Sequence, residues 1–144
     1  MKRRAFATAM LAAASASIAG FPASAVLAQG TDPVLPIVPE LILGNMTSQV
    51  VLTEYASYTC PHCANFHANV FKDLKRDYID NGKIKFVYRE VYFDREGLWA
   101  AMLARCGGDL RYFDIQDTLY STQKDWLGSR DPATVAKNLR QIGK

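Results

Sequence analysis

The sequence predicts an α/β fold in which one parallel β–α–β unit is followed by a layer of helices. A strand-like run at residues 50–56 precedes a helical repeat over about residues 61–78, and a second strand-like run follows at 84–88. Strand, helix and strand of these lengths form a right-handed parallel unit. From Arg95 onward the apolar residues recur at helical spacing, so we expect few strands and several helices.

The chain has 144 residues, the length of one domain. Three basic residues at positions 2–4 precede an alanine-rich apolar stretch at about 5–19, and small-residue cleavage sites end at Ala25 and Ala28. This pattern predicts a cleavable signal peptide over residues 1–28 rather than a stable membrane anchor, because the apolar stretch is short. The mature protein is therefore expected in a compartment where disulfides persist.

Three prolines keep residues 29–39 extended and indicate a linker, which leaves residues 40–144 as the domain. The whole chain has 17 Lys and Arg against 14 Asp and Glu, a net charge of +3. Without the three basic residues of the signal peptide, 14 basic and 14 acidic side chains remain. A balanced domain gives no reason to expect nucleic acid as a partner.

The elements of the first half follow from local signals. Leu41–Leu43 predicts a brief strand, and Gly44 turns the chain back toward residues 50–56. Pro61 suits the first position of a helix, where its missing amide proton costs no hydrogen bond. Gly82 is the expected cap at the end of that helix.

The helix predicted at 61–78 has an apolar stripe of four large residues at every fourth position: Phe66, Val70, Leu74 and Tyr78. Helical spacing places Cys63 on the same stripe. We therefore expect Cys63 to be shielded from solvent, one turn deeper than Cys60.

Three helices are predicted in the second half. The first carries a face of apolar residues: Leu98, Trp99, Met102, Leu103 and Cys106. The second carries large apolar residues at Tyr112, Phe113, Leu119 and Tyr120. The third begins at Asp131 as N-cap, with Pro132 next, and is lined by Val135, Leu139 and Ile142. The odd cysteine, Cys106, is interpreted as a small buried hydrophobic residue.

The motif Cys60-Pro61-His62-Cys63 stands where the strand-like run meets the helix. Two cysteines at this spacing and place are typical of a dithiol/disulfide redox centre. The unpaired amides and positive dipole of a helix start favour a thiolate at Cys60, and His62 adds a donor that can carry positive charge. A stabilised thiolate makes the disulfide a strong oxidant. Cys60 is therefore the expected nucleophile and Cys63 the resolving thiol.

Glu54 interrupts an apolar strand six positions before Cys60. If its side chain lies beneath the cysteine pair, a desolvated carboxylate there could relay a proton to or from Cys63. Ordinary strand alternation would instead point Glu54 to solvent, and the sequence leaves both readings open. His67, one turn after Cys63, is interpreted as a packed or solvated histidine without a part in the chemistry.

Other uses of the cysteine pair fit the sequence less well. A disulfide that closes so short a loop stabilises little. Haem attachment needs a histidine after the second cysteine, where Ala64 stands. A zinc site needs two more ligands, and the remaining thiol and imidazole candidates in the sequence are Cys106, His62 and His67. We therefore expect no metal and no other cofactor.

Three segments give the chain a resemblance to the DsbA-type branch of the thioredoxin superfamily: Glu54–His67, Lys85–Glu90 and Ala100–Cys106. The resemblance runs from about Glu40 to Trp126, and Cys-Pro-His-Cys is the usual pair of that branch. It implies a thioredoxin-like βαβ core with a helical insertion at about 95–144. It also implies a periplasmic thiol:disulfide oxidoreductase that donates a disulfide to exported proteins with free thiols and is reoxidised by a quinone-linked membrane protein.

The chain departs from that family pattern after Trp126. Family members continue with a cis-proline loop, two strands and a final helix, whereas the last proline here is Pro132 and the sequence stops at Lys144. We therefore expect an incomplete domain in which the C-terminal strands of the fold are missing and residues 50–56 have an open edge. Two other functions stay open, namely a disulfide reductase or isomerase and an inactive, truncated thioredoxin-like binding protein.

Overall fold

The computed structural model of the chain describes residues 38–129 and 131–144. The predicted signal peptide, residues 1–28, and most of the linker predicted for 29–39 therefore lie outside the described residues. No helix in the described ranges is long and apolar enough to cross a membrane.

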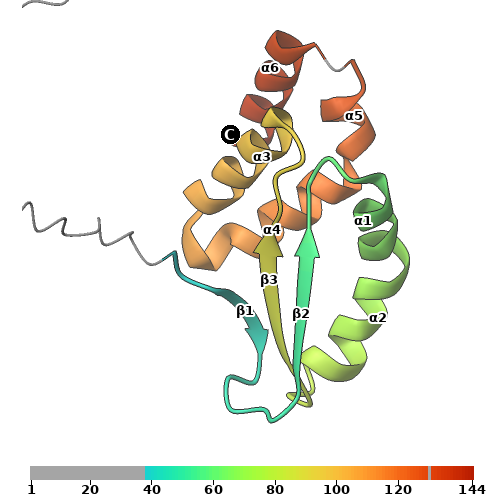
Figure 1. The fold of residues 1–144 in the computed structure, drawn as a ribbon, viewed down its shortest axis with the longest axis vertical. Helices are drawn as coiled ribbons and strands as arrows, with labels where there is room; N and C mark the ends of the chain where they lie inside the picture. Colours follow the sequence, from blue (N-terminus) through green and yellow to red (C-terminus); the bar gives the residue numbers. More distant parts are fainter. Residues whose placement is uncertain (1–37, 130) are drawn as a thin grey trace, which may run out of the picture. The chain divides into compact units, whose positions relative to one another are not determined.

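A three-stranded mixed sheet forms the centre of the fold (Figure 1). Its strands are β1 (Leu41–Gly44), β2 (Val51–Ala56) and β3 (Lys85–Glu90), in the spatial order β1-β3-β2. β2 runs parallel to β3, and β1 runs antiparallel to it. The sheet confirms the predicted parallel β–α–β unit and the brief first strand.

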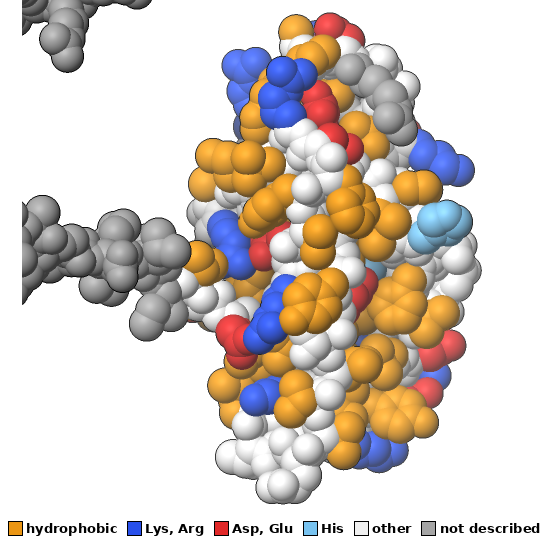
Figure 2. All heavy atoms as spheres, in the orientation of Figure 1, with side chains coloured by type: hydrophobic (Ala, Val, Ile, Leu, Met, Phe, Trp, Pro, Cys, Tyr) orange, Lys and Arg blue, Asp and Glu red, His pale blue; other side chains and the backbone are white. Residues whose placement is uncertain are grey.

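One edge of the sheet is open within the described part of the chain, because β2 pairs there with β3 alone. Hydrophobic side chains gather over β2 and the helix that follows it (Figure 2). The large exposed ones on these elements are Val50, Val51, Leu52, Tyr55, Val70 and Tyr78. The predicted open edge at residues 50–56 is therefore present among the described residues.

The turn after β1 depends on a glycine. Gly44 has a φ of +84°, which L side chains rarely adopt, and a Cβ at this position would lie 2.6 Å from the carbonyl oxygen of Ile84. Asn45 supports the turn, because its Oδ1 accepts a hydrogen bond from the N–H of Thr47 at 3.0 Å. The turn leads β1 and β2 to opposite sides of β3.

One continuous helical run, here called the crossover helix, connects β2 to β3. Its segments are α1 (Pro61–Phe66), η1 (His67–Phe71), α2 (Lys72–Leu74) and η2 (Lys75–Ile79), of which η1 and η2 are π-helical. The run ends as the sequence predicts, with Gly82 at a φ of +66°. The N–H of Gly82 donates to the carbonyl of Ile79 at 2.9 Å.

The buried face of the crossover helix corrects the predicted stripe. Val70 and Tyr78 are each 49% exposed, whereas His67 and Ile79 are buried and Phe71 packs against the core. A π-helical turn joins residue i to residue i+5, so it takes more residues than an α-helical turn. The residues that turn inward instead, His67, Phe71 and Ile79, belong to the two π-helical segments, whereas Leu74 of α2 packs against the core as predicted.

Four helices make up the second half. They are α3 (Arg95–Cys106), α4 (Gly108–Ser121), α5 (Gln123–Leu127) and α6 (Pro132–Ile142). The predicted N-cap of α6 is confirmed, since Oδ2 of Asp131 accepts from the N–H of Thr134 at 2.9 Å. α4 contacts both α3 and the crossover helix, so it joins the helical layer to the β–α–β unit.

The buried face of α3 also differs from the predicted one. Leu98 is 40% exposed and Met102 is 56% exposed. Cys106 is exposed at the end of the helix, so its interpretation as a buried residue is wrong. The buried residues of α3 are small: Gly97, Ala100, Ala101 and Ala104. Small side chains allow α3 to approach α4 and α6 closely, while Trp99 and Leu103 of the predicted face are half-buried and pack against the core.

Four buried tyrosines tie the sheet and its following loop to α4. The hydroxyls of Tyr58 and Tyr112 share a hydrogen bond of 2.7 Å, and those of Tyr88 and Tyr120 share one of 2.6 Å. Burial raises the pKa of all four hydroxyls, so they stay protonated. The Tyr112 hydroxyl also donates to Oε1 of Glu90 at 2.9 Å. This polar cluster fixes the position of the loop that carries Cys60.

Candidate active site

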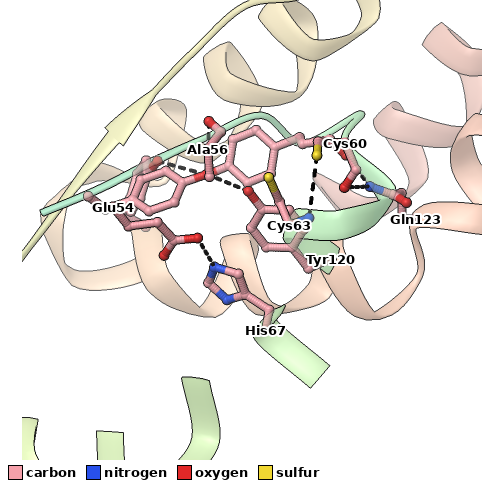
Figure 3. A network of polar contacts seen from close by, with 10 residues as sticks. Glu54, Ala56, Cys60, Cys63, His67, Tyr120 and Gln123 are labelled. Carbon is pink, nitrogen blue, oxygen red and sulfur yellow. Dashed lines mark hydrogen bonds and ion pairs between the residues drawn. The ribbon is translucent and has the colours of Figure 1, made fainter. Parts of the chain in front are cut away.

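The cysteine pair lies where the loop after β2 enters α1 (Figure 3). Cys60 is the N-cap residue of α1, with extended angles of φ −81° and ψ 117°, and Pro61 stands in the first turn. Sγ of Cys60 accepts a hydrogen bond from the N–H of Cys63 at 3.4 Å. The sulfur therefore occupies the place of a capping oxygen and receives a backbone donor that the helix itself leaves unpaired.

The surroundings of Cys60 favour its thiolate. Burial alone acts to raise the pKa of Cys60, because a charge forms less readily away from water. Hydrogen bonds from the Cys63 thiol and from the N–H groups of Cys63 and His62 outweigh burial and hold the pKa of Cys60 below its ordinary value of 9.0. The donors at the start of α1 therefore decide how Cys60 ionises.

The surroundings of Cys63 have the opposite effect. Burial raises the pKa of Cys63 to about 11, and the hydrogen bond to Cys60 and the negative charges of Cys60 and Glu54 act in the same direction. A backbone hydrogen bond from Ser57 lowers the pKa without offsetting these causes. The side chain of Cys63 is half-buried and packs against the core. The two thiols of one motif thus differ in how readily they lose a proton.

Pro61 and His62 lie exposed at the start of α1. Pro61 has the fixed φ that a first helical turn needs. The contribution of His62 to the ionisation of Cys60 comes from its backbone N–H. The structure therefore gathers the two thiols and backbone donors at one point, and the imidazole of His62 stays at the surface.

Glu54 lies on β2 beneath the cysteine pair (Figure 3). Its side chain is 14% exposed, and its Oε1 accepts a hydrogen bond from Nε2 of His67 at 3.2 Å. Of the two orientations left open by the sequence, the inward one is present. Its charge is one of the causes that raise the pKa of Cys63, so the carboxylate acts on the second cysteine.

His67 is packed, as one of the two sequence interpretations had it, but its contact with Glu54 was not predicted. The residue is 4% exposed, and its ring stacks on Tyr120 with centroids 4.1 Å apart and an interplanar angle of 18°. The available signal was spacing, since a histidine four residues after Cys63 falls on the same helix face. The spacing alone does not predict the contact, because it does not show that Glu54 faces His67 from β2.

Gln123 is a second residue of the site that the sequence analysis missed. It belongs to α5 and is 7% exposed. Its Nε2 donates to the carbonyl oxygens of Tyr58 at 2.8 Å and of Cys60 at 3.0 Å (Figure 3). One amide therefore fastens the helical layer to the loop that carries Cys60. No local pattern marks it, because its partners lie 65 and 63 residues earlier in the chain.

The arrangement is suited to thiol–disulfide exchange. In the part of the chain that the structure describes, no three His, Cys, Asp or Glu side chains come together as a metal site. A hollow of roughly 540 Å³ lies beside the start of α1, between that helix and the residues that join α4 to α5. Pro61 and Asn65 line one side of it, and Gln123 and Lys124 line the other. The hollow leaves room for an extended chain beside Cys60.

Comparison with known proteins agrees with this chemistry. A protein of Rickettsia bellii named "Putative protein-disulfide oxidoreductase" is 39% identical over 105 residues, which are 72% of this chain and 40% of the relative. "Disulfide bond formation protein D" of Bacillus subtilis is 34% identical over 126 residues and matches 79% of this chain and 56% of that protein. The chain thus spans about 40% of the length of the rickettsial relative.

Solved structures share the fold. Alpha-DsbA1 of Wolbachia pipientis is 29% identical, with a TM-score of 0.59 over 76% of this chain and 65% of that one. A protein-disulfide isomerase from Novosphingobium aromaticivorans shares the fold with a TM-score of 0.62, at 24% identity over 72% of this chain and 60% of that one. The family model described as thioredoxin matches residues 37–143. With its α/β fold, its helical insertion and its cysteine pair at a helix start, this chain belongs to the thioredoxin family.

Proposed function

We propose that this protein is a thiol:disulfide oxidoreductase that acts as an oxidant and donates the Cys60–Cys63 disulfide to exported proteins with free thiols. The observation that carries the proposal is the difference between the two cysteines. The pKa of Cys60 is lowered by donors at the start of α1, whereas burial raises the pKa of Cys63 to about 11. A dithiol in which one thiolate is stabilised is favoured in its reduced form, so its disulfide is a strong oxidant.

The proposed reaction has two exchange steps. A substrate thiolate attacks Sγ of Cys60, the Cys60–Cys63 bond breaks, and Cys63 leaves with the electron pair and takes up a proton. A second substrate thiolate then attacks the substrate sulfur of the mixed disulfide, and Cys60 leaves as a thiolate. The substrate loses two electrons and gains a disulfide, while the cysteine pair gains two electrons.

Each further site residue has a proposed role in these steps. Pro61 starts α1 without a competing donor, and His62 supports the thiolate of Cys60 through its backbone N–H and, when protonated, through its charge. Glu54, inward-facing on β2, relays a proton to and from Cys63. We propose no metal and no other cofactor for the reaction.

The proposed place of action is the periplasm. The support is the signal-peptide pattern at residues 1–28 and the need of a stable disulfide for an oxidising compartment. The proposed partners are exported proteins with free thiols and a quinone-linked membrane protein that restores the disulfide. The family resemblance is the basis for that second partner.

The test is the reduction potential of the Cys60–Cys63 pair, measured by equilibration with glutathione, together with oxidation of a peptide dithiol. We expect a potential well above that of thioredoxin, which is about −270 mV, and stoichiometric peptide oxidation by the disulfide form. The matched control is Cys60→Ala, which should have no oxidising activity.

Two outcomes would favour the other functions. A potential near that of thioredoxin contradicts the oxidant role and favours a reductase or isomerase. Binding of a partner protein that is equally strong in Cys60→Ala, without peptide oxidation by the unaltered protein, favours a binding protein.

A further inference from the structure

Only one of the two carboxylate oxygens of Glu54 has a hydrogen-bond partner among the described residues. Its Oε1 accepts from Nε2 of His67, whereas its Oε2 is buried and has no hydrogen-bond partner among the described residues. A buried carboxylate oxygen without a donor is costly, because water no longer solvates it. This oxygen is therefore ready to take up a proton, and Cys63 is the thiol on which the charge of Glu54 acts.

The imidazole of His67 is held rigidly against Glu54. Its ring stacks on Tyr120 with centroids 4.1 Å apart and lies 4.6 Å from the ring of Phe71. His67 is also the first residue of the π-helical segment η1. Single π-helical turns within α-helices occur frequently at functional sites. The packing thus fixes which ring nitrogen meets the carboxylate.

His67 also borders a hollow of roughly 60 Å³ between the crossover helix and α4. Lys72, Asp117, Tyr120 and Ser121 line this hollow. Its volume exceeds what one water molecule needs, and its walls carry polar groups. His67 therefore contacts Glu54 through Nε2 and also borders a space large enough for water.

We propose that His67 is a positioning residue that gives a proton to this hollow when Glu54 takes one from Cys63 and recovers it when Glu54 gives one back, so that Glu54 can serve Cys63 in every cycle. The proposal rests on the proposed function, in which Cys63 takes up a proton when the protein disulfide opens and loses one when it forms again. It adds a route by which a proton is exchanged with water.

The step is best followed when Cys63 resolves a mixed disulfide on Cys60. The Cys63 thiol gives its proton to Oε2 of Glu54, and its sulfur attacks Sγ of Cys60. The bond between Cys60 and the bound sulfur compound breaks, and that compound leaves as a thiolate with the electron pair. The Cys60–Cys63 disulfide forms, Glu54 keeps the proton from Cys63, and the protonated His67 ring, which retains its Nε2 hydrogen toward Glu54, gives the proton of its other nitrogen to water in the hollow.

Several titratable groups surround His67, and the pH dependence of the step belongs to them together. Glu54 faces it from β2 and Tyr88 from β3. Tyr120, Asp114 and Asp117 face it from α4. Lys72, Lys75 and Cys63 stand on the crossover helix itself. Burial raises the pKa of Tyr88 and Tyr120 beyond the neutral range, so these hydroxyls do not titrate there.

An aromatic disulfide that releases a coloured thiolate allows the reactions of Cys60 and Cys63 to be followed separately in one experiment. Added to the reduced protein carrying Cys106→Ser, which removes the exposed third thiol, it first forms a mixed disulfide on Cys60 and releases one coloured thiolate. Cys63 then closes the protein disulfide and releases the second. The first phase reports Cys60, and the second phase reports Cys63 and its proton.

The decisive variants are His67→Phe, which keeps a ring against Tyr120, and His67→Gln, which keeps a hydrogen-bond donor near Glu54. Both lack the proton carrier. We expect both to slow the second phase about tenfold or more near neutral pH, at the lower end of general acid–base contributions or above. The first phase should change less than about twofold. Asn69→Ala on the exposed side of η1 is the matched control and should leave both phases unchanged.

The outcomes separate this proposal from the proposed function. A second phase of unaltered rate and pH profile in His67→Gln overturns the proton route, even if His67→Phe fails to fold. Equal slowing of both phases in both variants also overturns it, because a merely structural defect has that effect. A first phase no faster than that of free cysteine, in the protein that carries Cys106→Ser alone, contradicts the proposed function instead.

Discussion

The start of α1 and the sheet beneath it shift the pKa values of two chemically identical thiols in opposite directions. At the helix start, backbone N–H groups and the Cys63 thiol lower the pKa of Cys60. Beneath it, burial raises the pKa of Cys63, and the charge of Glu54 adds to the effect. Unpaired donors at a helix start therefore determine how readily Cys60 loses its proton, whereas burial over a strand determines this for Cys63.

Removal of either sulfur gives the largest expected effect, and the two removals should have different outcomes. We expect Cys60→Ser to lose peptide oxidation completely, because the Cys60–Cys63 disulfide that accepts the electrons can no longer form. Reduced Cys63→Ser, given a single-cysteine peptide as its disulfide-linked dimer, should instead accumulate a stable disulfide between Cys60 and one peptide while the other peptide leaves as a thiolate, because the resolving thiol is absent. Mass spectrometry of the acid-quenched reaction measures both. A mixed disulfide on Cys63 in Cys60→Ser would contradict the assigned order of the two thiols.

Removal of the donor amide at Gln123 tests whether contacts from α5 help to lower the pKa of Cys60. Gln123→Met keeps the shape but leaves the carbonyl oxygens of Tyr58 and Cys60 without this donor. We expect a loss of about 1–3 kcal/mol in the free energy of unfolding and a rise in the pKa of Cys60. Urea unfolding and thiolate absorbance measure these two quantities.

The neighbouring surface residue provides the control for Gln123. Lys124→Met on α5 adds the same side chain where the structure has an exposed lysine, and it should change neither the unfolding midpoint nor the Cys60 titration. A Cys60 titration that Gln123→Met leaves unchanged would show that the amide holds the loop without affecting the thiolate.

The pH dependence of stability gives a smaller effect, because both thiols are partly exposed and solvent weakens each shift. The pKa of Cys60 is lowered in the folded state, so this thiol adds stability above pH 9 that is lost as pH falls through its folded pKa. The pKa of Cys63 is raised, so the stability it adds below pH 9 is lost as pH rises toward about 11.

Urea unfolding of the reduced protein across pH 6–11 therefore has a prescribed shape. The free energy of unfolding should rise as pH approaches 9 and fall between about 9 and 11. Cys60→Ala should remove the rise, and Cys63→Ala should remove the fall. If Cys60→Ala keeps the rise and removes the fall, the two thiols have been assigned the wrong way round.

The smallest expected effect comes from a change far from the cysteines, and it tests whether only nearby groups control their ionisation. Asp131→Ala removes the N-cap of α6, where Oδ2 accepts from the N–H of Thr134. We expect a loss of about 1 kcal/mol in the free energy of unfolding. The titrations of Cys60 and Cys63 should stay unchanged, because α6 has no hydrogen bond to the loop that carries them among the described residues. A shifted Cys60 titration would mean that the whole helical layer controls the thiolate.

Sequence-based expectations succeeded where the signal is local. Proline after Cys60 and aspartate before Pro132 mark helix starts, and glycine at positions 44 and 82 marks reversals that need a positive φ. Each of these depends on the backbone within a few residues. The parallel strand pair also followed, because a strand, a long helix and a strand have few other ways to pack.

Expectations failed where packing between distant segments decides. Within the π-helical segments η1 and η2 the inward face moved by one position, whereas Leu74 between them kept its predicted place; apolar spacing does not encode π-helical turns. In α3 the small residues turned inward and left Met102 and Cys106 outside. Of the large apolar residues expected inside, Trp99 and Leu103 still pack against the core, at its margin.

The chain alone specifies its chemistry, because a cysteine placed at a helix start meets backbone donors only three residues away. The environment of the second thiol depends on the assembled fold. Glu54 and His67 meet across 13 residues, and Gln123 reaches Cys60 across 63. Contacts at such separations exist only once the sheet and the helical layer have packed together, so they leave no mark in any short stretch of sequence.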